Sequence, residues 1–243
     1  MRPVVIFLRS AASLALFALF GAGSILLSPV MLVLRRPEAC QKAVRATWIP
    51  LVWLFRFTRL IRVDCGNLAP MRGTVIAANH PSLIDVVLVL TLVPKTLFVA
   101  KHALKGNPFM SAIVRHTSLP DDERLPDAAA EHLAKGWNVV VFPEGTRSPA
   151  AGGLGQFRRG AAHVALKAGA PLVALGIVQS PRRILGKHQW AWQMGDSPVT
   201  YSFRADAPTC ERVAEGETSR DAARRVTGLL RDRILRLVGQ VSP

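Results

Sequence analysis

Cysteine is scarce in this sequence, and the pattern of the few cysteines excludes two kinds of structural support. Cys40, Cys65 and Cys210 are odd in number, lie far apart and show neither paired nor metal-ligand spacing. Neither a disulfide framework nor a zinc site is therefore predicted, and the histidines show no metal-ligand spacing either. The simplest interpretation is a domain that holds no metal and faces a reducing, cytoplasmic compartment.

Acidic residues are also few, because Asp and Glu number 16 against 31 Lys and Arg. The formal charge is +15, although half of the residues are hydrophobic. An anionic membrane surface attracts nearby Lys and Arg by about 1 kcal/mol each, and the same charge attracts a polyanionic substrate. Nucleic acid fits poorly as a partner, since the single Tyr and ten Phe show no basic-aromatic interleaving and no known binding module. A phospholipid membrane is the predicted partner.

The first 62 residues are predicted to form a membrane-associated helical segment. Residues 10–34 contain no charge, and that length crosses a hydrocarbon core if it forms one straight helix. Gly21, Gly23 and Ser28-Pro29 interrupt the run, so two short apolar helices dipping into one leaflet compete with a single span. Basic residues on both sides favour two cytoplasmic ends.

Two features of this segment have a second interpretation. Arg2 and Arg9 could open a cleaved signal peptide, although the apolar stretch continues past the small residues Ala22-Gly23. Residues 48–63 carry arginines at intervals of three, which predicts a basic amphipathic helix lying in the membrane interface. An ordinary surface helix packed on the following domain explains that pattern equally well.

Residues 63–243 are predicted to form one domain in which strands and helices alternate. Buried strands are expected at 74–78, 97–100, 137–142 and 171–178, and helices at 81–92, from 107, at 125–136 and at 159–168. This order implies an α/β fold with a mostly parallel sheet flanked by helices. Residues 199–204 alternate like an edge strand. A final amphipathic helix at 219–238 places five apolar side chains on one face: Val226, Leu229, Leu230, Ile234 and Leu237.

The segment 79–85 reads Asn-His-Pro-Ser-Leu-Ile-Asp and places a histidine just before a helix, with a carboxylate one turn inside it. His80 and Asp85 are therefore expected to meet. Such a carboxylate fixes the imidazole tautomer and leaves the other nitrogen free to take a proton from a hydroxyl, which accelerates a reaction by about 10²–10⁴-fold. On spacing alone, the alternative is a helix-capping His80 and a solvent-facing Asp85.

The segment 142–148 reads Phe-Pro-Glu-Gly-Thr-Arg-Ser and follows the carboxyl end of an expected strand, where open α/β sheets bind ligands. Arg147 offers a planar fork to a phosphate, Gly145 allows close backbone approach, and Thr146 can donate a hydroxyl hydrogen bond. Glu144 is unusual in a phosphate site, and it could hold Arg147 in place or bind an acceptor hydroxyl. An ordinary turn with a surface ion pair is the alternative.

Asn-His-x-Ser-x-x-Asp followed about sixty residues later by Phe-Pro-Glu-Gly-Thr-Arg-Ser resembles the glycerol-phosphate and lysophosphatidic acid acyltransferase family, over roughly residues 63–204. The resemblance implies a catalytic pair of His80 and Asp85. It also implies that four residues help to bind the acceptor phosphate: Glu144, Gly145, Thr146 and Arg147. The family's membrane-embedded helix pair is similar to residues 4–62.

Two further segments bear on the acceptor that the family uses. Where the family carries a phosphate-binding Arg, residues 119–122 read Leu-Pro-Asp-Asp, and Arg115 or Arg124 is the nearest substitute. Residues 157–160, Phe-Arg-Arg-Gly, resemble the family's basic segment, so Arg158 or Arg159 could supply the missing phosphate contact. Either Arg could equally be a solvated start of a helix.

The resemblance implies a membrane-bound enzyme that transfers a fatty acyl group from acyl-CoA or acyl carrier protein to a lysophospholipid. The expected acceptor is 1-acyl-glycerol-3-phosphate, the product is phosphatidic acid, and the thioester co-substrate takes the place of a cofactor. The expected location is the cytoplasmic face of a cell membrane, the inner membrane in a bacterium. Two alternatives stay open: a carrier-protein-dependent enzyme with another hydroxylated or lyso-lipid acceptor, and a non-catalytic lipid-binding protein, which would not need the His80 and Asp85 pair.

Overall fold

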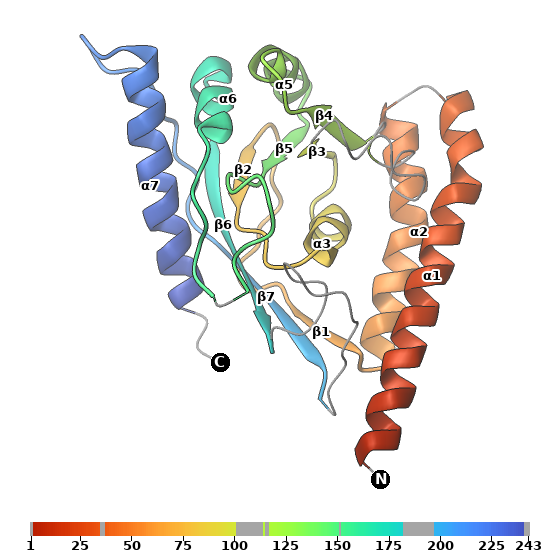
Figure 1. Ribbon diagram of the computed structural model, residues 1–243. Helices are drawn as coiled ribbons and strands as arrows, with labels where there is room; N and C mark the ends of the chain where they lie inside the picture. The colour runs from red at the N-terminus through yellow and green to blue at the C-terminus, as the bar shows by residue number, and fades with distance from the viewer. Residues whose placement is uncertain are drawn as a thin grey trace.

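A seven-stranded sheet lies at the centre of the protein, which we describe from a computed structural model for residues 2–34, 37–100, 114, 117–150, 152–181 and 197–240 (Figure 1). The strands lie in the order β1-β7-β6-β2-β5-β3-β4. Their bounds are β1 Ile61–Asp64, β2 Val75–Ala78, β3 Thr96–Ala100, β4 Ser118–Pro120, β5 Asn138–Val141, β6 Leu172–Ser180 and β7 Val199–Ala205. Among these described strands, β6 and β7 pair antiparallel and all other neighbours pair parallel. The α/β class is thereby confirmed, with a mixed sheet.

Helices cover both faces of this sheet (Figure 1). On one face, α5 (Leu125–Ala134), α6 (Gly160–Ala168) and α7 (Ser219–Gly239) share a core with β2, β5 and β6. On the other face, α3 (Ile84–Leu92) and α2 (Pro37–Phe57) form a second core, and α1 (Arg2–Leu34) packs along α2. Because both faces are covered, β2 and β5 are buried at every position, which explains why they are apolar apart from Asn138 at the start of β5.

The prediction of an edge strand at 199–204 was wrong, because β7 has a neighbour on each side. It pairs with β6 antiparallel and with β1 parallel, so that β1 takes the edge of the described sheet. The arginine spacing predicts a basic helix at 48–63, which includes residues 61–63 of β1. In the structure that helix, α2, begins at Pro37 and ends at Phe57, and the predicted domain boundary at residues 62 and 63 falls inside β1.

The prediction for α7 was correct at four of its five apolar positions. Val226, Leu230, Ile234 and Leu237 are buried, whereas Leu229 is 44% exposed. Ala222 and Ala223 are also buried and extend the stripe into the first turns of the helix. Their small side chains allow close packing there. Thr218 caps this helix, since its hydroxyl accepts a hydrogen bond from the Asp221 backbone N–H.

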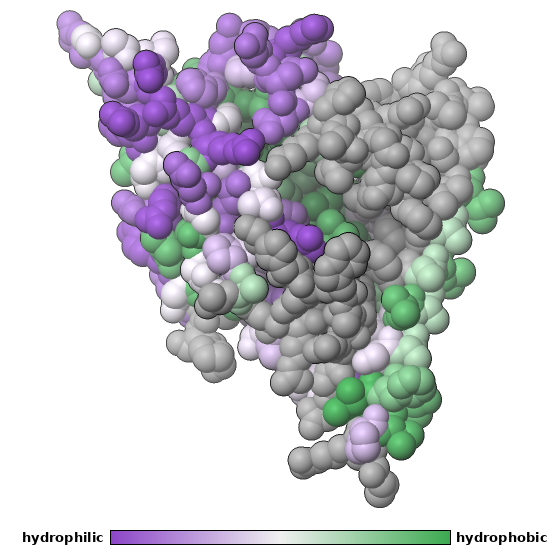
Figure 2. Space-filling view, in the orientation of Figure 1, coloured by the Kyte–Doolittle hydropathy of each residue, from purple (hydrophilic) through white to green (hydrophobic). Residues whose placement is uncertain are grey.

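The N-terminal segment forms a pair of helices. The expected interruption at Gly21 and Gly23 is absent, because α1 runs without a break for 33 residues, and α2 follows it. Hydrophobic side chains are exposed along α1 (Figure 2). Within the described residues, none of the helices has the combined length and apolarity needed to cross a bilayer. The helix expected from residue 107 lies outside the described residues.

Candidate functional site

The site begins where β2 ends, at Asn79 and His80. The Asn79 side chain bonds to β6 in both directions, donating to the carbonyl oxygen of Ile177 at 2.8 Å and accepting from its N–H at 2.7 Å. This anchor fixes the path of the chain into α3. His80 Nδ1 then lies 3.0 Å from Asp85 Oδ2, so the structure brings together the two side chains expected to meet. Their catalytic role stays a prediction.

Asp85 is fully buried, and its carboxylate accepts three hydrogen bonds. Oδ2 accepts from His80 Nδ1 and from the Ser82 backbone N–H at 2.7 Å, and Oδ1 accepts from the Ser82 hydroxyl at 2.7 Å. Burying a carboxylate is costly unless such donors replace water. Because Nδ1 carries its proton toward Asp85, the lone pair of the imidazole lies on Nε2.

Phe142, at the end of β5, fixes the plane of the imidazole. Its ring stacks on the His80 ring with centroids 4.2 Å apart and also lies against Phe98 on β3, with centroids 5.9 Å apart. The ring therefore holds His80 from the side, while Asp85 holds it through Nδ1. The sequence predicts no such role for Phe142, because stacking depends on the register between β2, β3 and β5.

Glu144 lies directly behind the backbone of His80. Its Oε1 accepts from the His80 N–H at 3.2 Å and from the Ser148 hydroxyl at 2.6 Å, and its Oε2 accepts from the Gly155 N–H at 2.7 Å. The Ser148 N–H also donates to the His80 carbonyl oxygen at 2.7 Å. Glu144 is buried, and both of its oxygens hold the loop against the histidine. Its expected contact with an acceptor stays a prediction.

Gly145 turns the same loop toward the cavity. Its φ of +61° lies in the left-handed region, where side chains are strained, and a Cβ there would stand 3.0 Å from Arg158 Nε. The Gly145 N–H donates to the Phe142 carbonyl oxygen at 2.9 Å and closes the turn. Glycine is therefore needed here for two reasons: the backbone conformation and the close approach of an arginine.

A cavity of about 440 Å³ opens in front of His80. One group of its lining residues is apolar: Leu83, Val86, Phe98, Val99, Val114, Leu125, Val141 and Phe142. The lining also contains four residues that the sequence singled out: Gly145, Thr146, Arg147 and Arg158. The cavity therefore joins an apolar wall to two guanidinium groups beside one imidazole, which suits a ligand with a hydrocarbon chain and an anionic head.

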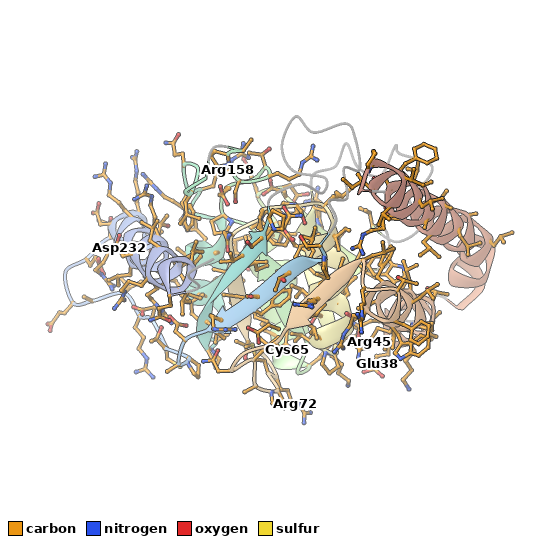
Figure 3. The ribbon with its side chains drawn as sticks, turned by 90° about the horizontal axis from the view of Figure 1, so that it is seen from below. Glu38, Arg45, Cys65, Arg72, Arg158 and Asp232 are labelled. Carbon is orange, nitrogen blue, oxygen red and sulfur yellow. The ribbon has the colours of Figure 1, made fainter. Side chains whose placement is uncertain are left out.

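Two of the residues predicted to bind the acceptor phosphate do not line this cavity. Glu144 borders a neighbouring hollow of about 370 Å³ together with Arg147 and Arg158. Arg159 precedes α6 and borders a separate hollow with Arg220 and Arg224 of α7. Of the two predicted alternatives for the second phosphate contact, the cavity therefore contains Arg158. In the view of Figure 3, Arg158 lies above the strands and Arg72, which precedes β2, lies below them.

An acidic residue stands where the resemblance leads one to expect an arginine. Asp121 follows β4 and lines the cavity. Its Oδ2 lies 3.8 Å from Nη1 of Arg158. Both side chains are well exposed, so this ion pair contributes little stability. Of the possible substitutes, Arg124 lies at the start of α5, away from the cavity lining, and Arg115 lies outside the described residues.

Comparison with known proteins places this arrangement in a family. A family model described as Acyltransferase matches residues 60–178, which contain both motifs. A 1-acyl-sn-glycerol-3-phosphate acyltransferase from Cocos nucifera is 30% identical over 169 residues, which are 60% of this chain and 51% of that protein. One from Pseudomonas aeruginosa is 30% identical over 159 residues, 61% of each protein. The chain spans about half the length of the curated relatives that it matches.

The crystal structure of the 1-acyl-sn-glycerophosphate acyltransferase PlsC from Thermotoga maritima has the same fold. The TM-score is 0.63 at 23% identity, with 96% of this chain and 97% of the other covered. The fold thus agrees with the sequence matches, and residues 60–178 contain the whole His80, Asp85 and Glu144 arrangement. Residues 60–178 of this chain therefore belong to the acyltransferase family.

Proposed function

We propose that this protein transfers a fatty acyl group from a thioester to the free hydroxyl of a lysophospholipid. The observation that carries the proposal is the position of His80, which is bonded to Asp85 through Nδ1 and lines a cavity with apolar and cationic parts. The proposed acceptor is 1-acyl-glycerol-3-phosphate, and the product is phosphatidic acid. The names of the relatives support this choice.

The proposed reaction needs one base and no covalent intermediate. Nε2 of His80 takes the proton of the acceptor hydroxyl as its oxygen attacks the acyl carbon, and Asp85 stabilises the imidazolium that forms. The C–O bond forms, the C–S bond breaks, and the thiolate that leaves takes the proton back from Nε2. Thioesters are activated enough for this direct route, because a thiolate is a good leaving group.

The two parts of the cavity would hold the two ends of the acceptor and donor. Arg147 and Arg158 would bind the phosphate, since planar guanidinium groups form paired hydrogen bonds with phosphate oxygens. The apolar wall would hold a hydrocarbon chain. Each CH₂ group that leaves water and is buried there contributes about 0.8 kcal/mol to the binding free energy.

We further propose that α1 and α2 hold the protein on the cytoplasmic face of a membrane. Trp53 and Phe57 of α2 stack on each other with centroids 5.1 Å apart, and their exposed fractions are 61% and 71%. Phe7, Leu19 and Leu26 of α1 are also largely exposed. Apolar surface of this extent is unusual where a protein faces water, and it marks an interaction site. Trp side chains favour the membrane interface.

A second acceptor class is supported by Asp121. This carboxylate lines the cavity near Arg158 and offsets part of its charge. A hydroxylated or lyso-lipid acceptor with an amine in place of a phosphate monoester would pair with Asp121 rather than be repelled by it. Acyl carrier protein as the donor is compatible with both acceptor classes.

The test is acyl transfer by detergent-solubilised protein from labelled acyl-CoA or acyl carrier protein to a panel of lyso-lipids. Wild type is expected to make phosphatidic acid from lysophosphatidic acid. His80→Ala is expected to lose at least about 10²-fold in rate, and His163→Ala, an exposed histidine on α6, to match wild type. Transfer only to amine-containing acceptors would favour the second class. Equal rates for His80→Ala and wild type would refute the proposed mechanism.

A further inference from the structure

A chain of buried hydroxyl and amide groups leads from Asp85 away from the cavity into the sheet. Ser82 Oγ, which donates to Asp85 Oδ1, lies 3.2 Å from the hydroxyl of Tyr201. That hydroxyl in turn accepts a hydrogen bond of 2.7 Å from Gln179 Nε2. Gln179 and Tyr201 face each other across β6 and β7 in the antiparallel register. Both residues follow the segment that the family model matches, and Tyr201 is the single tyrosine of the chain.

The charge of the carboxylate gives this chain one direction. A charged Asp85 only accepts, so the single proton of the Ser82 hydroxyl must point at Oδ1. The Ser82 oxygen then has lone pairs for Tyr201, whose proton points toward Ser82. The Tyr201 oxygen is left as an acceptor, and Gln179 supplies an N–H. Every hydroxyl dipole therefore points its positive end toward Asp85, and aligned hydrogen bonds of this kind strengthen one another.

Burial keeps the chain intact. Tyr201 and Ser82 are fully buried, and Gln179 is 3% exposed. Burial, with a smaller contribution from the nearby charge of Asp85, raises the pKa of Tyr201 far above its ordinary range. The phenol therefore keeps its proton and remains a donor toward Ser82 at every pH at which the enzyme would work. The chain moves no proton itself.

We propose that Tyr201 and Gln179 are positioning residues that hold Asp85 charged and oriented behind His80. This inference rests on the proposed function, in which His80 becomes an imidazolium during each turnover. If Asp85 took the Nδ1 proton at that point, the charge that stabilises the imidazolium would be lost. Two aligned hydroxyls that favour the carboxylate form oppose this transfer.

Other charged groups surround the histidine, but none of those described replaces this chain. Arg147, Arg158 and Asp121 line the cavity, whereas Ser82 and Tyr201 do not. Glu144 bonds to the backbone N–H of His80 rather than to its ring. Among the described residues, the donors to the Asp85 carboxylate come from His80 and Ser82 alone, so Tyr201 acts on Asp85 through Ser82.

Tyr201→Phe tests the proposal, because it removes one oxygen and keeps the buried ring. With fewer donors behind the carboxylate, the His80 and Asp85 pair binds protons more tightly. The acid limb of the pH profile of kcat/KM is therefore expected to move to higher pH. We expect kcat to fall roughly threefold to tenfold, the size of one neutral hydrogen bond, while KM stays unchanged because Tyr201 does not line the cavity.

Two further variants separate positioning from general damage to the fold. Ser202→Ala removes a buried hydroxyl from the next residue of β7, and it is expected to leave kcat and the acid limb unchanged. Gln179→Leu is expected to act in the same direction as Tyr201→Phe. Since both act through Ser82, the double variant is expected to lose less than the product of the two single effects.

Titration of the His80 imidazole by NMR, assigned with His80→Ala, keeps this test independent of the assay. If the wild-type protein shows no acyl transfer, the proposed function is overturned. The NMR titration then tests the positioning role of Tyr201 by itself. An upward shift of the His80 titration in folded Tyr201→Phe, with none in Ser202→Ala, supports the positioning role. A titration and an acid limb that are the same in folded Tyr201→Phe and wild type overturn it.

Discussion

The loops at the carboxyl ends of β2 and β5 differ from the α1 and α2 helices in what they bury. The loops and the first turn of α3 bury polar groups: Asp85 and Glu144 are almost inaccessible, and every carboxylate oxygen has a donor. The helices expose apolar groups instead, as Trp53 and Phe57 show. Figure 2 shows hydrophobic colour along α1, whereas the surface over α5, α6 and α7 is hydrophilic. Chemistry and attachment are thus expected to be separable properties of two regions.

The strongest way to test that separation is to damage the loops alone. Asp85→Asn keeps the shape of the side chain, but its amide cannot accept from both His80 and Ser82 through two charged oxygens. We expect the rate of acyl transfer to fall by about 10²–10⁴-fold, the range for losing an oriented general base. Co-flotation with anionic vesicles is expected to stay at the wild-type level, and a parallel loss of flotation would break the comparison.

The converse change removes the exposed aromatic pair of α2. Trp53→Ser with Phe57→Ser is expected to weaken partitioning onto vesicles by about a hundredfold or more, because each aromatic side chain contributes roughly 1.5–3 kcal/mol when buried and about 1.4 kcal/mol corresponds to a factor of ten. Transfer to a short-chain, water-soluble acceptor is expected to keep its wild-type kcat. Thr58→Ala, an exposed change at the end of the same helix, serves as the control for partitioning.

A smaller effect is expected within the loops at Arg147. Arg147→Lys keeps the positive charge but replaces a planar fork with a point charge, so paired hydrogen bonds to phosphate are lost. We expect KM for a phosphate acceptor to rise about tenfold with little change in kcat, as measured by initial rates. The same variant is expected to leave KM unchanged for an acceptor without phosphate. Equal increases for both acceptors would remove Arg147 from the proposed phosphate site.

The smallest effects concern two contacts that join α2 to the start of β3. Gln41 of α2 is buried and donates from Nε2 to the Thr96 carbonyl oxygen at 2.8 Å. Gln41→Leu leaves that oxygen without its donor and is expected to lower the free energy of unfolding by about 1–3 kcal/mol in denaturant titrations. Glu38→Gln breaks an exposed ion pair with Lys95 and is expected to change stability less.

The Glu38 pair also predicts a sign for the effect of pH. Its hydrogen bond to Lys95 lowers the pKa of Glu38, so the pair stabilises the fold above the ordinary range of the carboxyl. That contribution is lost as the pH falls through the lowered value. Wild type and Glu38→Gln are therefore expected to become equally stable at acid pH, and a difference that persisted there would exclude the ion pair as its cause.

Much of the fold follows from the order of apolar runs, because buried parallel strands have a distinctive sequence. The β2, β3, β5 and β6 strands lie within a few residues of their predicted positions. β1 was missed, since its four residues share the arginine spacing of the helix before them. β7 was placed at the edge because its second neighbour, β1, was missed.

The site was predictable where its contacts are local in the sequence. Asp85 lies five residues after His80, in the first turn of the helix that His80 precedes, so their contact follows from helix geometry. The contact of Glu144 with Gly155 crosses a glycine-rich loop of irregular path, and no periodicity predicts it. Tyr201 reaches Ser82 through the register of β6 and β7, which the apolar pattern does not determine.

The most direct test of the central claim is chemical rescue of the base. A His80→Gly protein leaves space beside Asp85 that free imidazole can enter. With His80 as the base, the variant transfers acyl groups slowly, and added imidazole raises its rate in proportion to the neutral imidazole present. A folded His80→Gly protein that matches the wild-type rate without imidazole would contradict the account.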